Sequence, residues 1–260
     1  MKRGLVGVAL LLLAACGGAQ AERVQLSGRT ETRNVAVGAF DKVELQGPDR
    51  VLVRVGGASS VQVSGDQAVL ERMRIAVEDD GKLVIRRKDR SSVNGARERA
   101  TVTVSVPRLV AAAVGGSGEM TVDRVVGHHG FAAAVGGSGD LAVGQVETGK
   151  LEAAIGGSGD LRFDRVEARE VSMAIGGSGS INAVGRATRV EAAIGGSGDI
   201  EAAGLQAVDA DVSIAGSGSA NVHARGLAKI AIVGSGDAVI SGGARCETSK
   251  MGSGSVRCGS

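Results

Sequence analysis

A Gly-Ser-Gly tract recurs from residue 117 onward at a nearly constant spacing. Its serines are Ser117, Ser138, Ser158, Ser178, Ser197, Ser217, Ser235 and Ser253, and the successive gaps are 21, 20, 20, 19, 20, 18 and 18 residues. A fixed period in this range is typical of a solenoid, in which each unit is too small to bury an apolar face alone and stacks on its neighbours. The repeat therefore predicts one elongated domain.

Side chains alternate within each unit. In residues 151–163 the large apolar side chains all fall on odd positions, and the charged side chains fall on even ones. A period of two indicates strand and not helix. About 20 residues at roughly 3.3 Å each make one turn of a coil, and stacked turns pair as parallel strands about 4.8 Å apart. We therefore predict an all-β fold, a right-handed parallel β-helix with about 20 residues per coil. A leucine-rich repeat has a similar period, but these units lack its several Leu and its Asn or Cys.

Glycine and serine positions in the unit predict a surface feature. Gly157 and Gly159 fall at inward parity, and we expect them to mark a bend where no inward side chain fits. The outward row beside them is uniformly small. Stacking would align seven serines into a ladder on a flat face: Ser117, Ser138, Ser158, Ser178, Ser197, Ser217 and Ser235. This ladder is a candidate docking face for a glycan, a second copy or the envelope. The alternative is that small residues only ease stacking at the bend.

The position two residues after each serine is mostly acidic. Its occupants are Glu119, Asp140, Asp160, Ser180, Asp199, Ser219, Asp237 and Ser255. Three serines argue against an obligatory metal ladder and favour an exposed polar row. Asp140 and Asp160, on neighbouring units, are weak calcium candidates.

Catalysis has little support in the sequence. The chain has three Phe and no Trp or Tyr, so few aromatic side chains are available for sugar stacking. We expect no catalytic residue and no cofactor. Because parallel β-helices include polysaccharide lyases and hydrolases, such an enzyme is an alternative by fold analogy alone, and a purely structural envelope protein is another.

Residues 1–21 read as a signal peptide. Lys2 and Arg3 precede an apolar run that is too short to span a bilayer, and the run ends in Leu13-Ala14-Ala15-Cys16. That tetrapeptide resembles the bacterial lipobox and predicts cleavage before Cys16 and its acylation. The alternative is an ordinary signal peptide cleaved after Ala21. The predicted location is the cell envelope, as an outer-membrane lipoprotein or a periplasmic protein, with surface exposure left open. Outer-membrane lipid would then be a partner through the N-terminal anchor.

The remaining segments follow in order. Residues 22–33 read as a polar tether, 34–107 as an irregular β cap without the Gly-Ser-Gly signature, and 108–258 as the regular coils. Within the cap, Asp66 is the expected N-cap of a short helix over 66–73, and residues 79–82 predict a hairpin turn. The basic cluster around Arg86, Arg87 and Lys88 reads as a charged exposed loop.

The cysteines and the net charge indicate the redox compartment and exclude one class of partner. With Cys16 assigned to lipid, Cys246 and Cys258 remain to form one disulfide in the last coil, which an oxidising compartment permits. The formal net charge is +2, and loss of Lys2 and Arg3 with the signal peptide leaves zero. Nucleic acid is therefore not an expected partner.

The repeated tracts also resemble a known family. Tracts of the Gly-Ser-Gly-Asp-Leu type, with Phe40-Asp-Lys-Val-Glu-Leu and Val104-Ser-Val-Pro-Arg-Leu109 before them, are similar to the GIN-domain family over roughly residues 34–258. That family is described as autotransporter-adhesin heads of unknown function. The resemblance implies a parallel β-helix on a Gram-negative envelope, acting as a binding or scaffold module, and it carries over no catalytic residue.

Overall fold

The structure is a computed structural model that describes residues 26–88, 99–128 and 130–259. The predicted signal peptide, with Cys16 and Ala21, lies outside the described residues. Strands make up 69% of the chain and helix 2%, and the coils form a β-solenoid of about 7 turns spaced about 20 residues apart. The predicted β-helix is therefore confirmed. No described helix has the length and apolar composition needed to cross a membrane.

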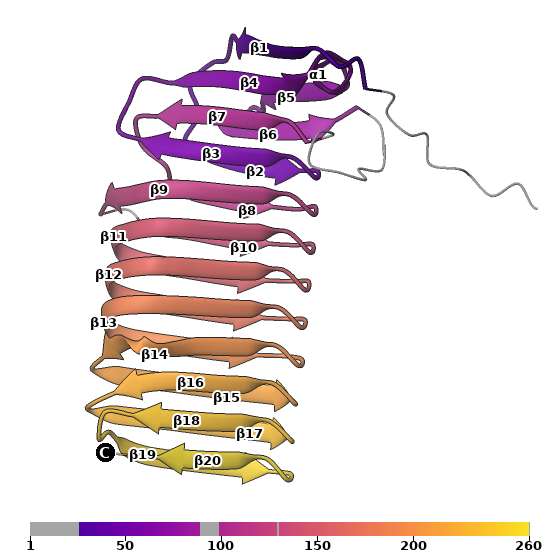
Figure 1. Cartoon of the computed structure of the whole chain (residues 1–260). Coiled ribbons are helices and arrows are strands. Elements are labelled where there is room, and N and C mark those ends of the chain that lie inside the picture. The colour runs from indigo at the N-terminus through magenta and orange to yellow at the C-terminus, as the bar shows by residue number, and fades with distance from the viewer. Residues whose placement is uncertain (1–25, 89–98, 129, 260) are drawn as a thin grey trace, which may run out of the picture.

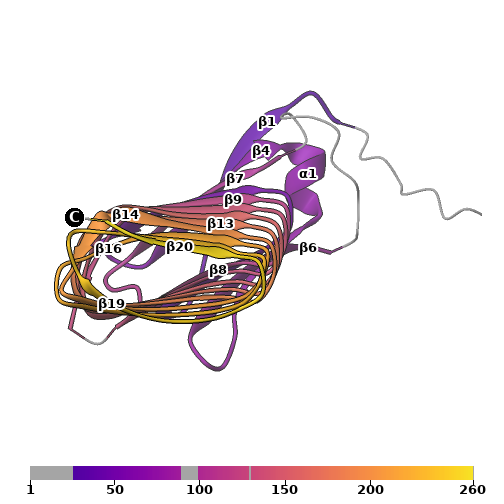
Figure 2. The same ribbon diagram turned by 90° about the horizontal axis from the view of Figure 1, so that it is seen from below.

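Each coil contributes one strand to each of two walls, which the view along the axis shows as a flattened ring (Figure 2). The first wall contains β9 (Glu119–Gly127), the first halves of β11 (Asp140–Ile155), β12 (Asp160–Ile175) and β13 (Ser180–Ile194), then β14 (Asp199–Ala207), β16 (Ser219–Ala224), β18 (Asp237–Ser241) and β20 (Ser255–Cys258). The second wall contains β8 (Ala111–Val114), β10 (Phe131–Val135), the second halves of β11, β12 and β13, then β15 (Asp209–Gly216), β17 (Leu227–Gly234) and β19 (Arg245–Met251).

Strands pair with the same strand of the next coil, in parallel and with a register of one full repeat. Asp140 pairs with Asp160 and Leu151 with Val171, so each of these residues lies over the residue 20 positions later. The same stacking continues through the pairs β12–β13, β15–β17 and β17–β19. The rungs therefore form a column of parallel strands, as Figure 1 shows.

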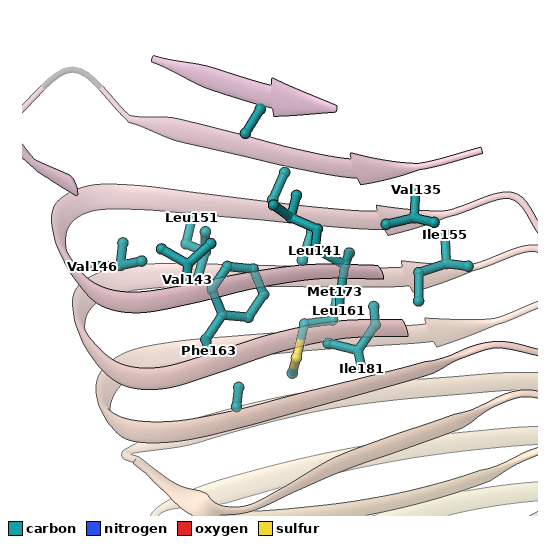
Figure 3. Packing of buried hydrophobic residues seen from close by; sticks show 14 of the residues in the cluster. Val135, Leu141, Val143, Val146, Leu151, Ile155, Leu161, Phe163, Met173 and Ile181 are labelled. Carbon is teal, nitrogen blue, oxygen red and sulfur yellow. The ribbon is translucent and has the colours of Figure 1, made fainter. Parts of the chain in front are cut away.

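Aliphatic side chains fill the space between the walls. Phe163 is fully buried, and Leu161, Ile155 and Met173 are at most 2% exposed. In Figure 3 these side chains point from both walls into the interior, with the Phe163 ring among them. The odd-position parity of residues 151–163 is thus the inward row of the coil.

Glycine occupies the inward positions at the turn because neighbouring rungs come too close for a side chain. A Cβ on Gly157 would lie well under 3.0 Å from the carbonyl oxygen of Gly137, and a Cβ on Gly159 would meet the carbonyl oxygen of Gly139 in the same way. The expectation that no inward side chain fits here is confirmed. Its cause is contact between the backbones of successive turns.

Residues before the first regular coil form a cap that continues the stack. β2 (Lys42–Gln46) and β3 (Arg50–Val55) lie parallel to β8 and β9, and β6 (Lys82–Arg87) and β7 (Thr101–Val106) form a further rung on them. Antiparallel strands then close the end: β4 (Ser60–Asp66) pairs with β7, and β5 (Met73–Val77) forms the predicted hairpin with β6.

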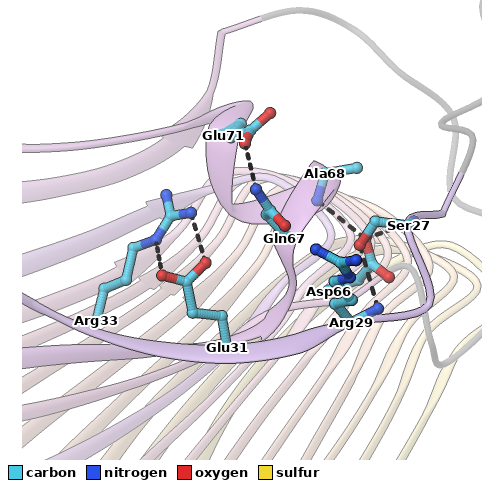
Figure 4. Close-up of polar contacts among 8 residues, drawn as sticks. All are labelled: Ser27, Arg29, Glu31, Arg33, Asp66, Gln67, Ala68 and Glu71. Atoms are coloured by element: carbon cyan, nitrogen blue, oxygen red, sulfur yellow. Dashed lines mark hydrogen bonds and ion pairs between the residues drawn. The ribbon is translucent and has the colours of Figure 1, made fainter.

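The tether expectation for residues 22–33 needs a correction. Residues 30–33 are not a tether, because they belong to β1 (Thr30–Val35), which pairs antiparallel with β4 at the outer edge of the cap. The short helix α1 (Gln67–Glu71) follows β4, and the Asp66 carboxylate caps it through the amide of Ala68. The same carboxylate accepts a hydrogen bond from the amide of Ser27 (Figure 4). It accepts another from the amide of Gly28. One side chain thus holds both the helix and the start of the described chain.

A buried ion pair closes the cap, and it corrects the expectation that Arg87 lies in an exposed loop. The Arg87 guanidinium donates to both carboxylate oxygens of Asp49, at 2.7 and 3.1 Å, and the Ala100 amide donates to the same carboxylate at 2.9 Å. Asp49 precedes β3, Arg87 ends β6 and Ala100 precedes β7. The pair therefore ties together the three chain segments that form the top of the coil.

At the other end, the predicted disulfide between Cys246 and Cys258 is present and links β19 to β20. Both cysteines continue inward columns, because Cys246 lies in register with Ala228 and Cys258 with Ile240. The bond therefore joins the two walls across the last rung.

Candidate functional site

The outer surface of the second wall carries a column of alanine and serine side chains. Successive strands place them in register: Ala113, Ala134, Ala154, Ala174, Ala193, Ser213, Ala231 and Ser249. Beside this column lies a second one, two residues further along each strand: Gly115, Gly136, Gly156, Gly176, Gly195, Ala215, Val233 and Met251. We call these two columns, with the serines that follow them, the small-residue face.

The serine ladder forms as predicted. The amides of Ser138, Ser158 and Ser178 donate to the carbonyl oxygens of Gly116, Gly137 and Gly157 on the preceding turn, at 3.1, 3.0 and 3.0 Å. Ser197, Ser217 and Ser235 repeat the arrangement, and Ser117 and Ser253 occupy the matching turns at the ends. All eight serines are exposed, and the hydroxyls of Ser235 and Ser253 lie 3.1 Å apart. The ladder follows the right-hand edge of the coil in Figure 1.

The outward glycines differ from the inward ones, because packing does not require them. A Cβ on Gly136 or Gly156 would meet no atom within 4 Å, and one on Gly176 would make only an ordinary contact at 3.7 Å. None of these three has a positive φ. Glycine in a strand or turn that tolerates alanine costs stability through chain entropy, by about 0.5–1 kcal/mol. The smallness of this column is thus a property of the surface and not of the stack.

Larger side chains in the same column support this conclusion. In the last two rungs the column holds Val233, which is 57% exposed, and Met251, which is 73% exposed. The coil therefore accepts bulky residues at this position without changing its register. Five consecutive glycines, from Gly115 to Gly195, leave the first part of the column without side chains, and Ala215 follows them.

On the first wall, the acidic column contains a pattern that sequence reasoning missed. From Asp160 onward it alternates Asp and Ser, and each serine donates to the aspartate on the rung before it: Ser180 to Asp160, Ser219 to Asp199, and Ser255 to Asp237. The hydrogen bonds that Asp237 accepts from the Ser255 hydroxyl and from the Ser255 amide hold the pKa of Asp237 below its ordinary value. The strict alternation of Asp and Ser in the sequence could have predicted these hydrogen bonds. It satisfies carboxylates that would otherwise stack on one another.

Asp140 and Asp160, the calcium candidates, are brought together in register. Glu119 lies in register on the other side of Asp140, where Arg50 binds it at 2.9 Å. One oxygen of Asp160 accepts the Ser180 hydroxyl at 2.6 Å. No group of three or more metal-binding side chains suited to hold an ion occurs among the residues that the structure describes.

The chain matches a known protein family. The family model described as "Putative auto-transporter adhesin, head GIN domain" matches residues 39–244. No curated protein matches the chain.

Several solved structures match almost end to end. A protein named "Putative lipid binding protein" from Parabacteroides distasonis has 25% identity and a TM-score of 0.81, with 91% of this chain and 99% of that chain covered. A "putative adhesin" from the same organism has 25% identity and a TM-score of 0.82, with 91% and 100% covered. A "putative adhesin" from Parabacteroides merdae has 21% identity and a TM-score of 0.80, with 92% and 99% covered.

Proposed function

Because the chain belongs to the family described as "Putative auto-transporter adhesin, head GIN domain", we propose that it is an adhesin-like, non-catalytic binding module of the bacterial cell envelope. The names of the family and of two similar structures as adhesins support an envelope or extracellular location. The repetitive flat walls support binding over a surface, since extended solenoid faces are typical docking surfaces.

The docking surface in this proposal is the small-residue face. The observation that carries it is the column of outward glycines that packing does not require. From Gly115 to Gly195 the face has no projecting side chains, which allows a flat partner to approach the backbone and the exposed serine hydroxyls together. The candidate partners are a glycan, another protein or a second copy of the chain.

Bulky charged residues on the ladder test the proposal. Ser158→Arg with Ser178→Arg should abolish glycan-array binding or, if the partner is a second copy, self-association measured by sedimentation. Asn182→Arg, on the exposed side of the first wall, is the matched control and should change neither. If the double variant behaves as the unaltered protein does in both assays, this face is not a docking surface.

The anchor is a separate part of the proposal. We propose acylation of Cys16 and outer-membrane attachment, on the basis of the lipobox-like Leu13–Cys16 tract. Mass spectrometry of the mature N-terminus should find an acylated Cys16, and Cys16→Ser should release the protein from membranes. An N-terminus at Glu22 would instead mean ordinary signal cleavage after Ala21. Proteolysis of intact cells distinguishes periplasmic from surface-exposed protein.

Two other functions are kept as alternatives. The name of one similar structure as a lipid-binding protein favours lipid as a second ligand class, to be checked by adding phospholipid vesicles to the same assays. A polysaccharide-active enzyme is tested by incubation of the protein with uronate polymers and calcium. New reducing ends would contradict the non-catalytic assignment.

A further inference from the structure

The edge of the coil opposite the serine turns carries a hollow of about 410 Å³. In Figure 1 this is the left-hand edge, where β11 and β12 bend from one wall into the other. The lining residues come from four successive rungs: His128, Gly130, Gly149, Lys150, Arg169, Glu170, Thr188 and Arg189. We call this edge the basic corner.

Two glycines make room for the hollow. Gly130 turns the chain with a φ of +95°, in the left-handed region that favours glycine. Gly149 lies between the His128 carbonyl and the Arg169 guanidinium, each little more than 3 Å from where its Cβ would be. The Arg169 side chain therefore folds back over Gly149 and brings its charge to the mouth of the hollow.

Charge in the hollow is uneven. Three cationic side chains, Lys150, Arg169 and Arg189, line it against the single carboxylate of Glu170. Lys150 is already bound by Glu152 at 2.7 Å. Among the described residues, neither Arg169 nor Arg189 has a carboxylate partner within ion-pair distance. Arginines 33, 50, 108, 162 and 245 are paired with acids. Other exposed arginines of the described chain, such as Arg54 and Arg225, also have no such partner, so the corner is distinguished by the grouping of its cations.

A second hollow of about 420 Å³ lies on the same bend, and Asp164 and Glu167 line it together with two arginines. β12 contributes Arg165 to it and β13 contributes Arg186, as the same two strands contribute Arg169 and Arg189 to the first. Each of these two rungs thus presents one arginine to each hollow. The excess of cations is in the first hollow, where Arg169 and Arg189 on successive rungs suit a molecule that carries at least two anionic groups along its length.

We propose that the basic corner binds an acidic polysaccharide through its carboxylate groups. A guanidinium donates paired hydrogen bonds that match the two oxygens of a carboxylate. A flexible chain can follow the convex bend and place successive charges beside Arg169 and Arg189, whereas a planar membrane surface cannot. No aliphatic or aromatic side chain lines the first hollow, so the insertion typical of membrane-binding surfaces has no counterpart there.

Titration of the mature protein with an oligogalacturonate of defined length tests the proposal by calorimetry. A neutral malto-oligosaccharide of the same length and phosphatidylglycerol vesicles are the parallel arms. The uronate should bind, with affinity falling as salt is added, and the neutral sugar should not. Arg169→Gln and Arg189→Gln should each weaken uronate binding about ten-fold, since bonds to charged groups are the stronger hydrogen bonds.

Controls keep the result specific to this corner. Arg108→Gln removes an exposed arginine that Asp41 pairs away from the corner, and it should leave the affinity unchanged. Arg169→Lys keeps the charge without the paired geometry and should lose part of the affinity while remaining folded. Three outcomes would overturn the proposal: equal binding of the neutral sugar, equal weakening by Arg108→Gln, or binding of the vesicles alone. The small-residue face lies on other residues, so its test fails or succeeds independently.

Discussion

At the scale of single residues, the coil glycines fall into two classes with opposite requirements. Gly159 is enclosed by the preceding turn, and Gly156 faces open space three residues earlier. We expect Gly159→Ala to cost about 3 kcal/mol or more through overpacking against backbone. Gly156→Ala should stabilise the fold by about 0.5–1 kcal/mol, because it restricts only the unfolded chain. Chemical denaturation of both variants measures the difference, and a destabilising Gly156→Ala would mean that packing does require the outward glycines.

The Asp49–Arg87 pair supplies a second residue-scale prediction. Both side chains are at most 3% exposed, so removal of Asp49 takes away the carboxylate that neutralises a buried guanidinium. Asp49→Ala should lower stability by about 3–5 kcal/mol. Arg50→Ala, which breaks the exposed neighbouring pair with Glu119, should cost no more than about 1 kcal/mol. Equal denaturation midpoints for the two variants would refute a structural role for the buried pair.

The inward glycines can be predicted from the sequence, but the Asp49–Arg87 ion pair cannot. The parity of the repeat fixes which residues face inward, so Gly157 and Gly159 could be assigned from position alone. Arg87 could not, because nothing local distinguishes it from Arg86. Its burial depends on Asp49, which lies 38 residues earlier and meets it only after the cap rung has stacked.

At the scale of elements, the Asp66 carboxylate links β1 to α1, and its charge makes that link depend on pH. The Ser27 amide, with further hydrogen bonds from Ala68, the Ser27 hydroxyl and Gly28, lowers the pKa of Asp66. A lowered folded-state pKa adds stability that is present above the ordinary aspartate pKa, about 3.9, and is lost as the pH falls below it.

Hydrogen exchange tests this local effect. The amides of Ser27, Gly28 and Ala68 should lose protection on acidification below about pH 4, whereas the amides of β12 keep theirs. In Asp66→Ala those three amides should be weakly protected at every pH. Protection that persists unchanged at low pH would show that other contacts hold the segment.

The disulfide acts on the last rung in the same local way. β19 and β20 end the stack, and each pairs with a strand of the preceding rung on one side. The paired change Cys246→Ser and Cys258→Ser should cost about 2–3 kcal/mol on the loop-entropy model. It should raise exchange in β19 and β20 first, because solenoid rungs are stabilised by their nearest neighbours. Loss of protection spread evenly over all coils would contradict that picture.

Prediction at this scale succeeded where the signal was local. The hairpin of β5 and β6 and the N-cap of α1 follow from short-range turn and capping chemistry. The sequence predicts a tether over residues 22–33, because that segment is polar and has no repeat period. Residues 30–33 nevertheless join β1, since β4 offers an antiparallel edge that only the folded cap creates.

At the scale of the whole molecule, one repeat determines both the stack and its surfaces. A register of one repeat places small residues over small residues and aspartates beside serines. The period predicted the walls and the serine ladder, because every position in a coil is repeated in the next. The period did not predict the basic corner. There Gly149 and Arg169 occupy the same position in successive repeats but differ in side chain. That site exists because the repeats are unequal there.

Distances along the serine ladder test the central claim, that each repeat advances the chain by one rung. Spin labels at Ser117 and Ser197 should lie about 19 Å apart, and labels at Ser117 and Ser235 about 29 Å apart, at about 4.8 Å per rung. Pulsed electron paramagnetic resonance measures both distances. Values that rise by one rung spacing per repeat are the predicted result, and distances that do not increase in proportion to the number of repeats would contradict the stacked coil.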